Sequence, residues 1–271
     1  MASEIMIHLD EHESSFVRAK AALGIASSQS ASVRGLVVGA TPSSSFVANE
    51  EVSEATLRTI ERNIAERAEA VKRRAEKELG IEVTLLSTSD DRVQVECASV
   101  MRAADFTAIA PPEYNDTTLD DDVFEAALFL SGRPALVISR KAELRGIGRN
   151  VLIAWKDCRE AARAVHDAVP FLKSATSVRL LAVTGEDDAR FFGQKALDRM
   201  AAHLAAIGAP VHQKVIAAGV GGAAAAILDE ARDCDLIVMG GYGHWRLSEW
   251  LFGGVTKSLL RHSAIPLFMS R

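Results

Sequence analysis

Residues 236–243 have the sequence LIVMGGYG, and residues 250–257 have the sequence WLFGGVTK. The first stretch opens with an apolar run that is typical of a buried strand and ends at Met239. Glycines interrupt the chain directly afterwards and again at Gly253 and Gly254, where a helix is expected to begin. A glycine break before a helix leaves main-chain N–H groups free beside the positive end of the helix dipole, which favours a bound phosphate.

These glycines have a defined spacing. Gly240, Gly243 and Gly253 follow the pattern G-x2-G-x9-G, and Thr256 lies shortly after the third glycine. The pattern resembles the C-terminal nucleotide motif of the universal stress protein family, in which Ser or Thr usually follows the third glycine. Gly254 stands at that position here, so the hydroxyl of Thr256 is the one that could contact a phosphate.

Composition limits the classes of function. The chain has 271 residues, of which 48% are hydrophobic and 25% charged, and this fits a soluble globular protein with room for two domains. A formal net charge of −5 argues against general nucleic-acid binding. Neither a membrane-spanning run nor a signal peptide is expected. The three cysteines are far apart and suggest neither a disulfide framework nor a metal site, so a cytoplasmic location is expected.

Apolar runs alternate with helical periodicity along the first half of the chain. This alternation predicts a parallel sheet with helices on both faces. The expected strands are 5–9, 32–38, 81–86, 106–110 and 134–139. The expected helices are 14–25, 51–79, 93–103 and 119–130, with a loop over 41–45.

The second half of the chain repeats the first. The segment 177–183, SVRLLAV, matches 32–38, SVRGLVV. Other corresponding segments are 151–155 with 5–9, 235–239 with 105–109, and 266–270 with 134–139. The repeat predicts a duplicated domain, with the first copy over 1–140, a linker over 141–150 and the second copy over 151–271.

The resemblance to the universal stress protein family covers the chain as a tandem pair and is carried mainly by the second half. It implies an α/β fold of the Rossmann-like, adenine nucleotide alpha hydrolase-like kind, with two tandem open parallel five-stranded sheets flanked by helices. Domains of the family pair through their last strands, which implies that 134–139 and 265–269 lie side by side across a pseudo-twofold axis. This internal pseudo-dimer would cover two exposed sheet edges, and a further homodimer is left open.

In open parallel sheets, ligands bind beyond the carboxyl ends of the strands, where three segments of the second copy are expected to converge. The resemblance implies an Asp after the first strand, replaced here by Lys156, a valine near the adenine and the glycine motif around the phosphates. The expected nucleotide-binding residues are Ala154, Trp155, Lys156, Val183, Met239, Gly240, Gly243, His244, Arg246, Gly253, Gly254, Val255 and Thr256.

Each of these residues also has a purely structural interpretation. Gly240 and Gly243 could form a sharp turn that leaves a strand, and the later glycines could open a helix that needs small residues for packing. Lys156, His244 and Arg246 could be ordinary surface residues. The joint spacing of the glycines, rather than any one of them, favours nucleotide binding.

The first copy lacks the glycine motif. Its corresponding loop, 111–122, contains two prolines, which remove amide donors, and several acidic residues, which repel phosphate. Asp10 occupies the position at which the resemblance implies an Asp. We therefore expect a structural role for this copy, either in pairing with the second or as an acidic surface.

No catalytic residue and no metal ligand is predicted. A P-loop, a dinucleotide fingerprint, a nucleophile elbow and paired metal-binding histidines are all missing from the sequence. The expected function is that of a cytoplasmic universal stress protein that binds ATP, with or without Mg²⁺, as a stress-response sensor or regulator. Two alternatives are a scaffold for a protein partner that has lost ATP binding, and a slow ATPase.

Overall fold

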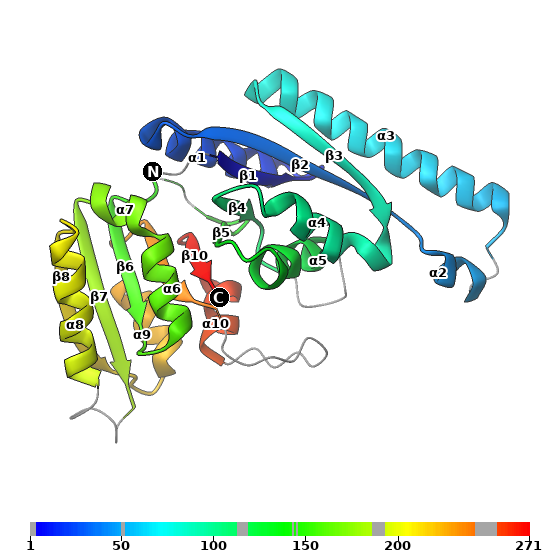
Figure 1. Ribbon diagram of the computed structural model, residues 1–271. Coiled ribbons are helices and arrows are strands. Elements are labelled where there is room, and N and C mark those ends of the chain that lie inside the picture. Colours follow the sequence, from blue (N-terminus) through cyan, green and yellow to red (C-terminus); the bar gives the residue numbers. More distant parts are fainter. Residues whose placement is uncertain are drawn as a thin grey trace. The chain divides into compact units, whose positions relative to one another are not determined.

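The computed structural model describes residues 4–49, 52–112, 119–142, 144, 146–185, 193–241 and 254–271. The chain forms two compact units, Met1–Arg133 and Pro134–Arg271 (Figure 1). The copy boundaries expected from the sequence, at 140 and 150, stay a prediction. Among the helices of the described ranges, none combines the length and the apolar character needed to cross a membrane.

The first unit contains a four-stranded parallel sheet, in which β1 lies between β2 and β4, and β3 lies beyond β2. Helices flank this sheet, as the alternating pattern predicted (Figure 1). Its elements are β1 (Glu4–Leu9), α1 (Glu13–Gln29), β2 (Ser32–Thr41), α2 (Ser44–Asn49), α3 (Glu54–Leu79), β3 (Glu82–Ser89), α4 (Val93–Met101), β4 (Phe106–Ile109) and α5 (Leu119–Glu125).

The second unit contains six strands in the order β5-β10-β9-β6-β7-β8. All pairings are parallel except that of β5 with β10, which is antiparallel. Its elements are β5 (Ala135–Val137), β6 (Asn150–Trp155), α6 (Arg159–Asp167), α7 (Val169–Ser174), β7 (Ser177–Thr184), α8 (Gly193–Ala206), β8 (Val211–Ala217), α9 (Gly222–Glu230), β9 (Leu236–Gly240), α10 (Gly254–His262) and β10 (Leu267–Ser270). The expectation that 134–139 and 265–269 lie side by side is therefore confirmed.

Central strands of both sheets are apolar and buried because helices cover both of their faces. Ile5 to Leu9 in β1 and Leu236 to Met239 in β9 are buried at every position. The long helix α3 buries far less of its surface, since only Ala68, Val71 and Ala75 are buried along its 26 residues. Its remaining faces carry charged side chains, many of which form ion pairs one helical turn apart.

The structure corrects three expectations about local structure. The segment 41–45 is not a continuous loop, because β2 extends to Thr41 and α2 begins at Ser44. The long helix begins at Glu54 rather than at residue 51, because the side chain of Ser53 caps it by accepting a hydrogen bond from the amide of Thr56. The helix expected over 119–130 changes after Glu125 into a π-helical turn, Ala126–Leu130.

An aspartate directly before β4 in the first unit, and another directly before β9 in the second, hold the neighbouring strands β1 and β6 in register. In the first unit, the amide of Asp105 donates to Glu4 O, and the Asp105 carboxylate accepts the amide of Glu4. In the second, the amide of Asp235 donates to Asn150 O. The Asp235 carboxylate accepts the amides of Gly148, Arg149 and Asn150 at 2.8, 3.0 and 3.1 Å.

We predict that Asp235→Ala lowers the free energy of unfolding by about 2 kcal/mol, because three amides lose a charged acceptor. Chemical denaturation followed by circular dichroism measures this change. Asp229→Ala is the matched control, since Asp229 is largely exposed and pairs with the exposed Arg232, and its effect should stay within about 0.5 kcal/mol. Equal effects of the two substitutions would contradict the role given to Asp235.

Candidate functional site

The strand order of the second unit reverses at β6, beside the carboxyl ends of β6 and β9. The strand that follows β6 in sequence, β7, pairs on one side of it, while β9 pairs on the other. This change of direction in the strand order is where open parallel sheets bind ligands. The chain leaves β6 into α6 and leaves β9 toward α10, so both helices start on this side of the sheet.

The strand ends bring several of the predicted residues together. Ala154 and Met239 are register partners on β6 and β9, and Trp155 is the register partner of Ala182 on β7, directly before Val183. Met239 is buried and Val183 is half-buried, while Lys156 is exposed directly after β6. These residues therefore share one edge of the sheet, as predicted.

Trp155 has a feature that the sequence did not indicate. Its side chain is 9% exposed, and its buried Nε1 has no hydrogen-bond partner among the described residues. A buried donor without an acceptor costs about 1–3 kcal/mol, so an acceptor brought by a ligand at this position would be stabilising.

Gly240 has a packing role. A Cβ atom added here would lie 2.6 Å from the backbone nitrogen of Ala161 and 2.7 Å from the carbonyl carbon of Glu160. The end of β9 therefore approaches the first turn of α6 so closely that only glycine fits. This close contact with α6 is sufficient to explain why residue 240 is a glycine.

The main-chain amide of Gly241, in the first glycine cluster, is not free. Its amide donates a 2.7 Å hydrogen bond to Ser270 O, which extends the pairing of β9 with β10. This donor is occupied within the protein and is not available to a phosphate.

Of the second glycine pair, Gly253 and Gly254, the structure describes Gly254, where a helix begins as predicted. Helix α10 begins at Gly254, and its first N–H groups have no partner within the helix. Gly254 and Val255 are exposed, whereas Thr256 is 8% exposed. A Cβ atom on Gly254 would meet nothing within 4 Å, so this position has room for a side chain.

Four of the predicted site residues lie outside the described residues. They are Gly243, His244, Arg246 and Gly253. Of the three glycines of the G-x2-G-x9-G motif, the structure therefore describes Gly240, and α10 begins one residue after the third.

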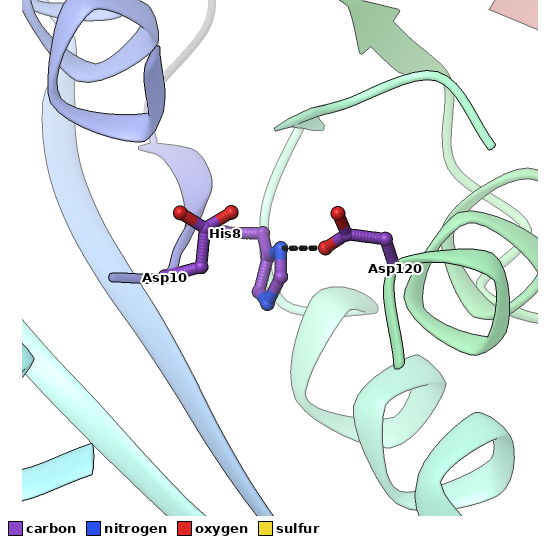
Figure 2. Close-up of side chains that lie close together, drawn as sticks. All are labelled: His8, Asp10 and Asp120. Carbon is purple, nitrogen blue, oxygen red and sulfur yellow. Dashed lines mark ion pairs between the residues drawn. The ribbon is translucent and has the colours of Figure 1, made fainter. Parts of the chain in front are cut away.

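A second group of polar side chains lies at the corresponding sheet edge of the first unit. His8, Asp10 and Asp120 each offer one ligand atom, and these atoms all lie within 4.8 Å of one another. Figure 2 shows the His8 ring between the two carboxylates, with Nδ1 toward Asp120. Nδ1 is 3.8 Å from Asp120 Oδ1, and Asp10 Oδ2 is 3.7 Å from Arg18.

Burial, together with the Arg18 guanidinium, lowers the pKa of His8 to about 4, although the two carboxylates act in the opposite direction. The His8 ring is therefore neutral near pH 7, and its contact with Asp120 is not an ion pair there. Sequence analysis missed this cluster because Asp120 is distant in the chain and the histidines have no paired metal spacing. Only the packing of α5 near the end of β1 brings the three residues together.

Gly240 and Gly254 should respond differently to substitution by alanine. Gly240→Ala should lower the free energy of unfolding by about 1–3 kcal/mol, because its Cβ meets backbone atoms of α6 that cannot easily move. Gly254→Ala should leave stability unchanged or raise it by up to about 1 kcal/mol, because alanine favours a helix and the site is open. Chemical denaturation compares them, and a tolerated Gly240→Ala would refute the packing role.

Comparisons with known proteins agree with this architecture. Residues 148–271 match the model of the Universal stress protein family. A universal stress protein from Archaeoglobus fulgidus has a solved structure that aligns with 99% of this chain and 98% of its own, at 19% identity and a TM-score of 0.70. A functionally unknown protein from Pseudomonas aeruginosa aligns with 99% of this chain and 92% of its own, at 15% identity and a TM-score of 0.61.

Both of these solved structures share the fold of this chain over its two units. No curated protein is similar enough in sequence to match the chain. The family match lies in the unit that carries the glycine motif, the α10 start and the carboxyl ends of β6 and β9. Residues 148–271 form a domain of the universal stress protein family.

Proposed function

We propose that this universal stress protein binds an adenine nucleotide, ATP, at the carboxyl edge of the second sheet and acts as a cytoplasmic sensor or regulator in the stress response. The observation that carries the proposal is the start of α10 at an exposed Gly254, directly after the glycine motif. The N–H groups and the dipole of this helix favour the negative charge of a phosphate.

The side chains at the neighbouring strand ends suit the remaining parts of a nucleotide. Val183 is half-buried at the end of β7 and offers an apolar contact for a base. The buried Nε1 of Trp155 is a donor in need of an acceptor, and a nucleotide carries many. Lys156 is exposed after β6, where its ammonium can pair with a phosphate in place of the usual Asp contact.

A second candidate is a protein-binding scaffold without a nucleotide. Two observations favour it: Gly240 is explained by the contact with α6, and the Gly241 amide already bonds Ser270. Gly254 also lacks the hydroxyl that the family usually has at this position. On this alternative, the second unit keeps the fold of a nucleotide site while its surface serves a protein partner.

Isothermal titration of the full chain with ATP, with and without Mg²⁺, distinguishes the two candidates. Gly254→Glu should weaken ATP binding at least tenfold, because its carboxylate would stand where the phosphate is proposed to bind. It should not unfold the protein, since the site is open and an acidic residue at a helix start is stabilising.

Gly24→Glu is the matched control. Gly24 lies on the exposed side of α1 in the first unit, and a Cβ atom there would also meet nothing within 4 Å. The Gly24→Glu substitution adds the same charge far from Gly254 in the sequence and should leave ATP affinity unchanged. Gly254→Ser should strengthen binding by restoring the family's hydroxyl. No binding of ATP by the unaltered chain would reject the nucleotide site and favour the scaffold.

A further inference from the structure

We propose that His8, Asp10 and Asp120 form a binding site for one divalent transition-metal ion, Zn²⁺ being the best match, in the first unit. The residues come from two elements that the fold brings together. His8 and Asp10 are two positions apart at the end of β1, so they lie on the same face of the strand, and Asp120 lies in the first turn of α5. This site is independent of the proposed nucleotide site.

The His8 ring is buried, and its contact with Asp120 is longer than a hydrogen bond. The residue is 2% exposed, and the distance of 3.8 Å from Nδ1 to Asp120 Oδ1 is too long for a hydrogen bond. Buried imidazoles normally have partners, because leaving a polar group unsatisfied costs about 1–3 kcal/mol. An ion at this place would give the ring nitrogen a partner.

Asp10 supplies a second observation of the same kind. Its Oδ2 atom is buried and has no hydrogen-bond partner among the described residues, while Oδ1 accepts the amide of His12 at 2.7 Å. Oδ2 faces Arg18 at 3.7 Å, which is an ion-pair contact rather than a hydrogen bond. The carboxylate is thus anchored through one oxygen, and the other is available as a ligand.

The donor set selects the class of ion. One imidazole nitrogen with two carboxylate oxygens suits Zn²⁺ and its transition-metal neighbours, whereas Mg²⁺ and Ca²⁺ prefer oxygen ligands only. Donors around a tetrahedral Zn²⁺ at about 2.1 Å lie roughly 3.4 Å apart. The observed atoms lie within 4.8 Å, so small side-chain rotations would close the site.

Charge and access are compatible with ion binding. The Asp10 carboxylate faces one buried guanidinium, Arg18, which also donates a 3.1 Å hydrogen bond to His8 O and so fixes the end of β1. The negative charges of Asp10 and Asp120 favour a cation near the ring. The side chains of Asp10 and Asp120 are 18% and 14% exposed, which leaves a route from solvent to the buried ring.

The second unit provides an internal comparison. Ile5 pairs with Phe106 on β4 as Val151 pairs with Leu236 on β9, so the two registers correspond. Counting along β1 and β6, the counterparts of His8 and Asp10 are Ala154 and Lys156. Neither offers the same ligand, so the proposed site belongs to the first unit.

The test is titration of the full chain, freed of metal with a chelator, with Zn²⁺ alone. We expect one high-affinity ion per chain. Asp120→Asn and Asp10→Asn should each weaken binding at least tenfold, because they keep the side-chain shape and remove a charged ligand. Asp91→Asn, an exposed acidic residue of the same unit, is the matched control and should bind as the unaltered chain does. Unchanged affinity in both site variants would overturn the proposal.

A second measurement uses only the unaltered chain, so it does not depend on the folding of any variant. Co²⁺ replaces Zn²⁺ in sites of this kind and shifts the NMR signals of a coordinated imidazole. The ring signals of His8 should shift strongly on addition of one equivalent, and Mg²⁺ should not reproduce this. A Co²⁺ complex in which the His8 signals do not move would also overturn the proposal.

Discussion

The hydrogen bonds between β1 and β4 in the first unit, and between β6 and β9 in the second, are the constraint on which both candidate sites depend. Asp105 and Asp235 occupy the same place in the two copies and bond the beginning of β1 and of β6, respectively. A shift of one residue in either pairing would turn every side chain to the opposite face. At the far end of these strands, that shift would remove His8 from its cluster and Ala154 from its place beside Met239.

The sheet edges of the two units have corresponding strand registers but oppositely charged residues at the strand end. In the first unit, the strand end carries Asp10 and faces the acidic start of α5. In the second unit, the strand end carries Lys156, and α10, the helix that follows β9 in the sequence, begins at a glycine. The first edge therefore attracts cations and the second attracts anions. The two proposed sites thus differ in chemistry because the loops and strand ends differ while the buried strands keep the scaffold.

Much of this architecture was predictable because buried strands have a simple sequence signature. Runs such as 5–9 and 236–239 are short, apolar and bounded by polar residues or glycine, and the repeat made the duplication visible. The start of α10 at Gly254 was predicted from the same glycine pattern. The role of Gly240 was not, because it depends on how closely α6 approaches the strand. The His8 cluster was also missed, since it joins residues whose proximity only tertiary packing creates.

The antiparallel pairing of β5 with β10 bears on how the chain can be divided into smaller pieces. Ala135 to Val137 cover the outer side of β10, so a fragment that starts after residue 140 would lose this strand. The bare edge of β10 would then present unsatisfied backbone groups to any extended chain nearby, which invites self-association. A soluble fragment of the C-terminal half should therefore start before Pro134, so that it carries its own protective strand.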